Sequence, residues 1–238
     1  MLPKPVAARH SEYSMILSAD DEPTRPSRAL INLAIETIAR ARDLRLDGFD
    51  ARAPGAAEVA NLWPGEQHRL LAALVEVQQP RRIVEIGTGP GISTLAMGAR
   101  LPREGRLVTF DVVPWHRIPE TVLCADDFAD GRLVQQVDDV THTDGWRRHR
   151  ELFHEADLVF VDAAKDGRME ARLVELLRGC SFRTPPVLVF DDIRVWNMLS
   201  TWRALPWPKL DVTSFGHWTG TGLAQWTPPD DSAAGMNG

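Results

Sequence analysis

Short runs of β-branched and other apolar residues alternate along the chain with longer segments in which apolar residues recur every three or four positions. The short runs predict buried strands, and the longer segments predict helices between them. The predicted strands span 82–86, 107–110, 132–137, 158–161 and 186–190. The predicted helices span 30–42, 68–77, 93–100, 146–153, 168–177 and 193–205. Runs at 210–215 and 223–227, joined around Gly220 and Gly222, predict a closing hairpin.

Strands that alternate with helices predict an α/β fold with a doubly wound, mostly parallel sheet. With the hairpin, we expect a Rossmann-like sheet of seven strands that carries a C-terminal antiparallel pair and extra N-terminal helices. Residues 1–63 are predicted as an N-terminal arm with cap helices, 64–228 as the main domain, and 229–238 as a disordered tail. Residues 47–54 are predicted as a turn. The N-terminal helices could cover a ligand or form a homodimer contact, and their pattern does not choose between the two.

Composition narrows the range of partners. The 238 residues carry a net charge of −6 and no run rich in Lys or Arg, which weighs against nucleic acid. Cys124 and Cys180 are the only cysteines, so neither a disulfide framework nor a cysteine metal motif is expected. The first twenty residues lack the apolar core of a signal peptide, and no run reaches the roughly 18 apolar residues that cross a bilayer. We therefore expect no membrane association and a cytoplasmic location.

A glycine-rich turn follows the first predicted strand, with Gly87, Gly89 and Gly91 in alternate positions. Glycine has no Cβ, so such a loop can turn sharply and lie against a ligand. The helix that follows can present free N–H groups to an anionic group. Asp111 ends the next strand, twenty positions after Gly91, where a carboxylate can accept both hydroxyl hydrogens of a ribose. This β-α-β unit predicts a nucleotide-binding site.

The spacing of the glycines separates two classes of nucleotide ligand. The loop reads G-x-G-x-G, whereas a dinucleotide fingerprint reads G-x-G-x-x-G, and Ile92 stands where the last glycine would be. Glu85, inside the preceding strand, also disfavours a pyrophosphate site, and with it an oxidoreductase. The stretch Val84 to Gly91 instead resembles the first motif of the class I S-adenosylmethionine (SAM)-dependent methyltransferases. A glycine turn that binds no ligand is the alternative.

This resemblance implies a set of cofactor contacts. It assigns Asp111 to the ribose hydroxyls of SAM and Asp138 or Asp139 to the adenine side. The residues that it assigns to the rest of the cofactor lie in or next to the glycine loop: Glu85, Gly87, Thr88, Gly89, Gly91 and Ser93.

Acidic residues also end the later strands. Asp162 follows the fourth predicted strand, and Asp191 and Asp192 follow the fifth. The carboxyl ends of parallel strands share one edge of a sheet, so these carboxylates should converge there. Without a neutralising partner they would repel one another, and oxygen ligands suit Mg²⁺ or Ca²⁺. The pattern predicts a site for Mg²⁺ or another divalent cation; aspartates that only cap helices are the alternative.

Here the chain also resembles the metal-dependent small-molecule O-methyltransferases, of the catechol and caffeoyl-CoA type and of the macrolide and aminocoumarin sugar type. The resemblance covers roughly residues 64–195. It implies that Asp162, Asp191 and Asp192 bind the metal. It also implies that Asp162 touches the cofactor, and that Lys165, as the base, and Asp162 are the catalytic residues. The Asp191-Asp192 pair is closer to the sugar type, whereas the segments 112–116 and 214–222 depart from the catechol pattern.

Aromatic residues cluster in the last quarter of the chain: Trp196, Trp202, Trp207, Trp218 and Trp226. They could wall an aromatic or sugar acceptor, although such residues more often pack a core. His217 could be a second base or an acceptor contact, although a lone histidine is usually structural.

We therefore expect a SAM-dependent O-methyltransferase of secondary metabolism that methylates a hydroxyl of a small phenolic, sugar or other natural-product acceptor with the help of Mg²⁺. Lys165 as a base would need a pKa lowered towards neutrality. Three alternatives stay open: a SAM enzyme that cyclises SAM or rearranges a substrate, a metal-independent methyl transfer, and a binding protein without turnover.

Overall fold

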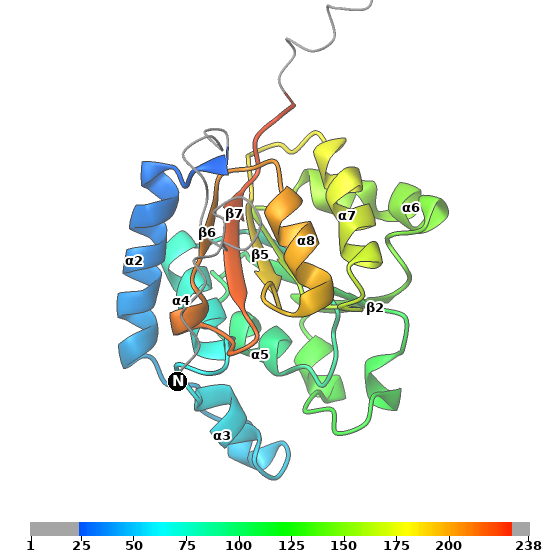
Figure 1. Ribbon diagram of the computed structural model, residues 1–238. Coiled ribbons are helices and arrows are strands. Elements are labelled where there is room, and N and C mark those ends of the chain that lie inside the picture. Colours follow the sequence, from blue (N-terminus) through cyan, green and yellow to red (C-terminus); the bar gives the residue numbers. More distant parts are fainter. Residues whose placement is uncertain (1–23, 230–238) are drawn as a thin grey trace, which may run out of the picture.

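A single seven-stranded sheet forms the centre of the computed structural model, which describes residues 24–229 (Figure 1). Its strands lie in the order β3-β2-β1-β4-β5-β7-β6. The strands in chain order are β1 (Arg82–Ile86), β2 (Arg106–Asp111), β3 (Leu133–Val137), β4 (Leu158–Val161), β5 (Val187–Asp191), β6 (Lys209–Asp211) and β7 (Thr221–Gln225). The first five pair in parallel, and β7 runs antiparallel between β5 and β6. The predicted Rossmann-like fold class is confirmed.

Helices cover both faces of the sheet (Figure 1). One apolar layer holds residues of α2 (Arg28–Asp43), α3 (Ala56–Asn61), α4 (His68–Gln78) and α5 (Ile92–Gly98). The other holds residues of α6 (Thr143–His154), α7 (Arg168–Arg178) and α8 (Trp196–Ala204). Short 3₁₀ segments occupy parts of the connections: η2 (Phe49–Ala51), η3 (Trp115–Arg117), η4 (Ala125–Phe128) and η5 (Thr213–Phe215).

Strand β1 shows how the sequence builds these layers. Successive side chains of a strand point to opposite faces, so Ile83 packs in the first layer and Val84 in the second. Both residues are 1% exposed, as expected for a strand with helices on both faces. Because β1 pairs with β2 on one side and β4 on the other, the strand order reverses between β1 and β4. Ligands of such sheets bind at that point, beyond the carboxyl ends of the strands.

One helix was missed and several predicted boundaries were wrong. Helix α3 was not predicted at all. The helix expected from 193 begins only at Trp196, because Asp192 is left-handed, with φ 59°, and Val195 is extended. The strand expected over 210–215 ends at Asp211, whose carboxylate accepts hydrogen bonds from the backbone N–H and the hydroxyl of Thr213 and turns the chain into η5.

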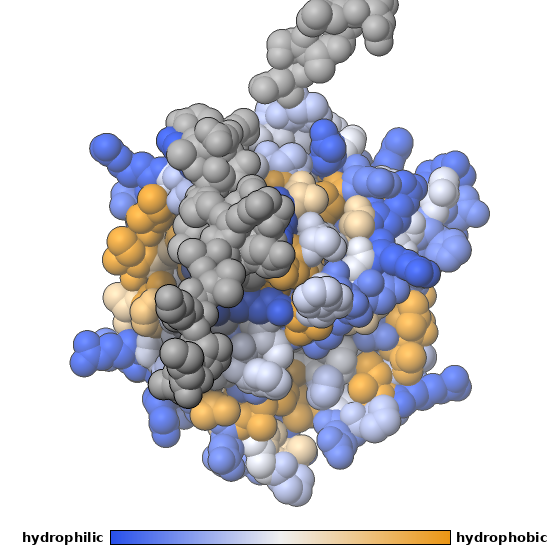
Figure 2. All heavy atoms as spheres, viewed as in Figure 1, coloured by the Kyte–Doolittle hydropathy of each residue, from blue (hydrophilic) through white to orange (hydrophobic). Residues whose placement is uncertain are grey.

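The N-terminal helix α2 lies against α4, where Arg40 forms an ion pair with Glu76 at 2.5 Å. Ser27, its N-cap, donates a hydrogen bond to Gln225 of β7. Its outer face exposes Ile31 and Ile35, and Figure 2 shows apolar atoms over this helix. The homodimer contact stays a prediction. Residues 1–23 of the predicted arm and 230–238 of the predicted tail lie outside the described residues. No helix within 24–229 is long and apolar enough to cross a membrane.

The C-terminal tryptophans divide into two groups. Trp202, Trp207 and Trp226 are buried, as expected for residues that pack the core. Trp196 and Trp218 are 86% and 73% exposed, so they are available to contact a ligand.

Candidate active site

The glycine loop is fixed by the strands around it. Gly87 donates its backbone N–H to Phe110 at 2.8 Å and has φ 99°, and a Cβ built on it would lie 1.7 Å from the carbonyl oxygen of Asp162. Only glycine fits this position. Gly89 also has a positive φ, 50°, but a Cβ there would meet no atom within 4 Å, because its backbone faces an open cavity. The start of the loop at Gly87 is therefore fixed by its contacts, whereas the tip at Gly89 is accessible to a ligand.

Glu85 lies beneath this loop and is fully buried. Its carboxylate accepts hydrogen bonds from the hydroxyls of Ser93 at 2.6 Å and Thr94 at 2.5 Å, which ties the start of α5 to β1. Burial raises the pKa of Glu85 to about 7. Glu85 is not among the cavity-lining residues, whereas Ser93 is, so within this structure Glu85 positions the loop from below.

Asp111 stands at the end of β2, across the loop. Its Oδ2 accepts the backbone N–H of Gly89 at 3.2 Å, and its Oδ1 accepts that of Val113 at 3.0 Å. A carboxylate oxygen can accept two hydrogen bonds, so each oxygen retains one site for a ligand hydroxyl. The ribose contact of Asp111 stays a prediction.

The two aspartates after β3 differ in their partners. Asp138 accepts hydrogen bonds from the guanidinium of Arg148 at 2.7 Å and from His149 at 2.9 Å. The Arg148 hydrogen bond lowers the pKa of Asp138. Asp139 caps the following turn by accepting the N–H and the hydroxyl of Thr141. Both aspartates line the cavity, and their assignment to the adenine side of the cofactor stays a prediction.

One cavity of about 640 Å³ joins these groups to the acids of the later strands. Its volume is in the range of cofactor and substrate sites. Its walls include the glycine loop, Asp111, the Asp138-Asp139 pair and, at the other end, Asp162, Lys165, Asp191 and His217. The free acceptor sites of Asp111 suit the hydroxyls of a ribose, and the open backbone of the glycine loop suits an amino acid moiety. These residues therefore fit SAM.

Lys165 lies between two carboxylates at the far end of the cavity. Its Nζ is 2.6 Å from Oδ2 of Asp192 and 3.3 Å from Oδ1 of Asp162. Burial opposes the charged form, but Asp162 and Asp192 outweigh it and raise the pKa of Lys165. The lowered pKa that a base would need is therefore absent here. Lys165 and Asp192 both have left-handed backbones, with φ 58° and 59°, and such strain concentrates at functional sites.

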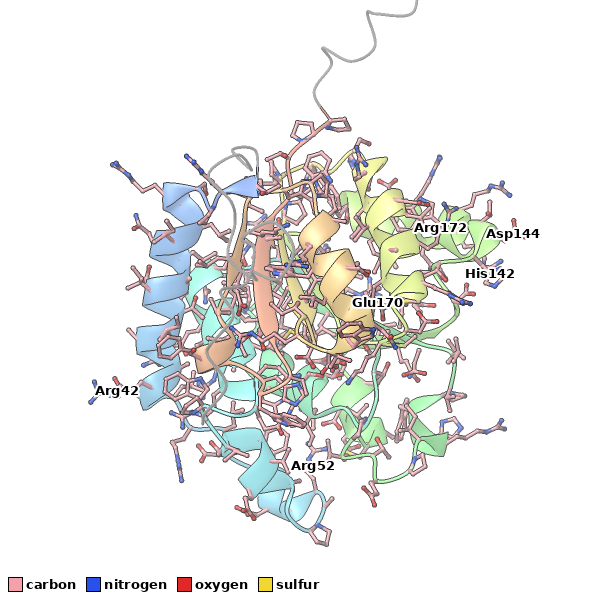
Figure 3. All side chains as sticks on the ribbon, in the orientation of Figure 1. Arg42, Arg52, His142, Asp144, Glu170 and Arg172 are labelled. Carbon is pink, nitrogen blue, oxygen red and sulfur yellow. The ribbon has the colours of Figure 1, made fainter. Side chains whose placement is uncertain are left out.

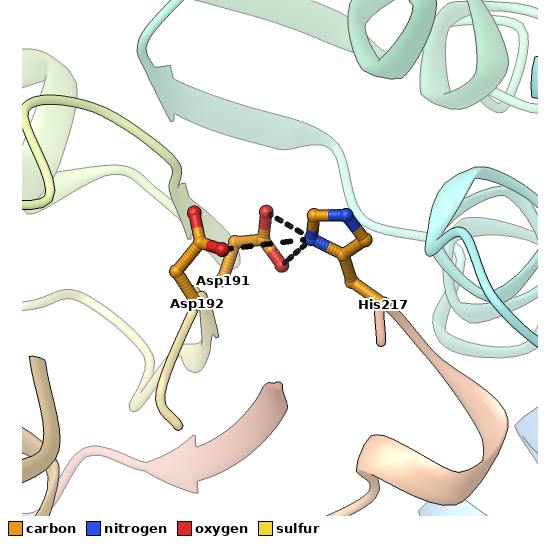
Figure 4. Close-up of side chains that lie close together, drawn as sticks. All are labelled: Asp191, Asp192 and His217. Carbon is orange, nitrogen blue, oxygen red and sulfur yellow. Dashed lines mark hydrogen bonds and ion pairs between the residues drawn. The ribbon is translucent and has the colours of Figure 1, made fainter. Parts of the chain in front are cut away.

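Asp191, Asp192 and His217 form a second group at this end (Figure 4). Nδ1 of His217 is 3.1 Å from Asp191 Oδ2 and 3.7 Å from Asp192 Oδ1. Burial raises the pKa of Asp191. Burial opposes protonation of His217, but its hydrogen bond to Asp191 outweighs this and raises the pKa of the imidazole.

Asp162, the third predicted metal ligand, is not part of this group. Burial, followed by the charge of Asp191, raises the pKa of Asp162 to about 7. The structure thus brings Asp191 and Asp192 together as expected but places His217 with them, while Asp162 faces Lys165. The role of Asp162 as a ligand stays a prediction.

The segment before α4 supplies residues that the sequence pattern did not reveal. Gly65 exchanges backbone hydrogen bonds with Gly216 and Trp218, which places Glu66 beside His217. Gln67 donates from Nε2 to Asp191 at 3.1 Å. Burial lowers the pKa of the neighbouring His68 to about 4, so its ring is neutral. Periodicity shows only where α4 begins, and carries no signal for this pairing.

The profile of the O-methyltransferase family matches residues 55–197. The chain belongs to this family. The match runs from just before α3 to the start of α8 and includes the glycine loop, Asp111, Lys165 and the Asp191-Asp192 pair. The expectation of a SAM-dependent methyltransferase of class I is confirmed.

Solved structures show the same fold. An O-methyltransferase from Bacillus cereus in complex with SAH is 19% identical, with a TM-score of 0.57 over 82% of this chain and 97% of that one. TomG from Streptomyces achromogenes, an O-methyltransferase of tomaymycin synthesis in complex with SAM, is 20% identical, with a TM-score of 0.53 over 88% and 100%. Cofactor-bound Rv0187 from MTB is 20% identical, with a TM-score of 0.56 over 86% and 100%. No curated protein matches the chain.

Proposed function

We propose that this methyltransferase transfers the methyl group of SAM to a hydroxyl oxygen of a small-molecule acceptor, assisted by a divalent cation. The observation that carries the proposal is the single cavity that runs from the glycine loop and Asp111 to Lys165, Asp191 and His217. One end offers the groups that hold SAM. The other end offers charged groups that can orient and activate an acceptor oxygen.

The cofactor end works by position. The loop tip at Gly89 leaves room for the ligand, and Asp111 accepts the ribose hydroxyls, so the methyl-bearing end is directed along the cavity. SAM supplies an electrophilic methyl group. Holding donor and acceptor in line removes much of the entropy that a bimolecular transfer would lose.

The acceptor end works by charge. The side chain of Lys165 is 43% exposed and is held by Asp162 and Asp192, so its ammonium can face an acceptor oxygen whose proton passes to water. A divalent cation held by Asp191 and Asp192 would supply the same kind of stabilisation, because it favours the ionised form of a hydroxyl. The exposed rings of Trp196 and Trp218 are not part of the cavity lining, although Trp218 lies beside His217. They would contact only an aromatic or sugar acceptor that extends beyond the cavity.

The test is an acceptor screen with purified protein, SAM and Mg²⁺ or Mn²⁺. The panel contains catechols, other phenols and glycosylated natural products, and mass spectrometry detects methylated product. Formation of product that is lost in Asp111→Ala supports the proposal. Turnover of SAM without a methylated acceptor would favour the non-methylating alternative, and activity that survives EDTA would remove the cation from the reaction.

Lys165 has its own test. Lys165→Met should lower kcat by about 10²- to 10⁴-fold at unchanged SAM affinity. Lys165→Arg separates the two roles of the lysine, because arginine keeps the charge but does not release its proton. Retained activity in the Arg variant identifies an electrostatic role, whereas loss equal to that of the Met variant identifies the base.

A further inference from the structure

We propose that Asp191, Asp192 and His217 form a metal centre that binds a first-row transition-metal ion in preference to Mg²⁺. The inference rests on the proposed function, whose cation it specifies. It differs from the all-carboxylate site predicted from the sequence, because one ligand is an imidazole nitrogen.

The distances between donor atoms suit a single ion. One donor atom from each of the three side chains lies within 4.8 Å of the others. Ligands about 2.1 Å from one ion lie about 3.0–3.4 Å apart in octahedral or tetrahedral geometry. The 3.1 Å between His217 and Asp191 is in this range, and the 3.7 Å between His217 and Asp192 exceeds it by a few tenths of an ångström. Three protein ligands leave positions for an acceptor oxygen or water.

The surroundings of His217 match those of a ligating imidazole. A histidine that binds metal through one nitrogen usually directs the other to a carboxylate or carbonyl, which fixes the tautomer. Nδ1 faces Asp191 and Asp192 and also lies 2.8 Å from the hydroxyl of Thr219, which a bound ion would have to displace. Nε2 lies 3.8 Å from Glu66 Oε2, which is an ion-pair distance and not a hydrogen bond. Glu66 is held there by the pairing of Gly65 with the segment of His217.

Gln67 gives an independent indication of a missing partner. Gln67 is 3% exposed and lines the same cavity, and its Nε2 donates a hydrogen bond to Asp191. Its Oε1 is buried and has no hydrogen-bond partner among the described residues. A buried acceptor without a partner in this position indicates a bound water or ion next to the three donors.

The donor set determines which ion is preferred. Mg²⁺ favours oxygen ligands and keeps most of its waters, whereas imidazole suits Zn²⁺, Fe²⁺, Co²⁺ and Ni²⁺. Each of these ions binds a mixed nitrogen and oxygen site more tightly than Mn²⁺ does, in the usual order of divalent first-row metals. The histidine therefore adds affinity for a transition metal and adds little for Mg²⁺.

The experiment titrates EDTA-treated full-length protein with Co²⁺, without acceptor, and follows the visible absorption of the bound ion. Competition with Mg²⁺ then gives the relative affinities. We expect His217→Asn to weaken Co²⁺ binding on the order of 100-fold and Glu66→Gln about 10-fold. Mg²⁺ binding should change by less than about 3-fold in both variants.

A matched control removes an imidazole elsewhere. His142 is 82% exposed at the N-terminus of α6 (Figure 3), so His142→Asn should bind Co²⁺ as the wild type does. Three results would overturn the inference. The first is Mg²⁺ binding that is as tight as Co²⁺ binding or tighter, the second is Co²⁺ binding that survives His217→Asn, and the third is no metal binding at all. If His217→Asn does not fold, the wild-type competition and Glu66→Gln still decide. SAM titration of the same samples keeps the two proposals apart, because intact SAM binding without metal preference refutes only the metal centre.

Discussion

Removal of the Asp111 carboxylate should weaken SAM binding by a magnitude that follows from its contacts. Two of its acceptor sites are taken by Gly89 and Val113, which leaves one on each oxygen for the ribose. A hydrogen bond to a charged group contributes about 1.5–3 kcal/mol. Asp111→Asn loses the charge and one acceptor, so SAM affinity should fall about 10- to 150-fold. Asp111→Ala loses both bonds, and water replaces part of them, so we expect a fall of about 150- to 1000-fold.

Isothermal titration calorimetry with SAM measures both variants. Asp144→Asn is the matched control, because Asp144 is 76% exposed on α6 (Figure 3), outside the cavity, and its loss should leave SAM affinity unchanged. Thermal melts verify that each variant folds. Wild-type affinity in Asp111→Ala would refute the assignment of this carboxylate to the ribose, and an equal loss in Asp144→Asn would point to a general effect of charge.

Three further changes test the fold that supports the site. Gly87→Ala should prevent stable folding, because its Cβ would overlap the backbone of Asp162; Gly48→Ala, with a similar φ of 86° but open space, should lose only about 1–2 kcal/mol in urea unfolding. Burial raises the pKa of Glu85 from 4.5 to about 7, so the folded state holds its proton longer than the unfolded state does. The free energy of unfolding should fall by roughly 3 kcal/mol as the pH rises through that window, and Glu85→Gln should flatten this dependence. Lys209→Met should lower the stability by about 2–4 kcal/mol, since its ammonium donates to three carbonyls at the end of α8.

The central strands could be predicted because their chemistry is local. Runs such as Leu158 to Val161 are apolar on both faces, and only a strand between two helical layers buries them fully. The position of Asp111 and Asp162 also followed from the sequence, because parallel strands place their carboxyl ends on one edge. Helix α3 has six residues, fewer than two turns, so its apolar pattern is too short to distinguish it from a turn.

The partners of the acids could not be predicted because they depend on strand order. Thr221 pairs with Asp191 only because β7 enters the sheet between β5 and β6, and this pairing brings His217 back to the end of β5. A hairpin pattern does not say which of its strands joins the sheet. Glu66 likewise reaches the site through backbone pairing of Gly65, which side-chain periodicity does not report.

The charges at the acceptor end explain why an additional cation would be stable there. Within residues 24–229, Asp162, Asp191, Asp192 and Glu66 face the ammonium of Lys165 and the imidazole of His217. Glu66 also faces the imidazole of His68, which is neutral. Burial raises the pKa values of three of these acids, Glu66, Asp162 and Asp191, which means that their negative charge is only partly compensated by the protein. Either protons or a cation must supply the remainder. A divalent ion would supply this positive charge without protonation of the carboxylates. Lys165 could then face the acceptor instead of Asp192.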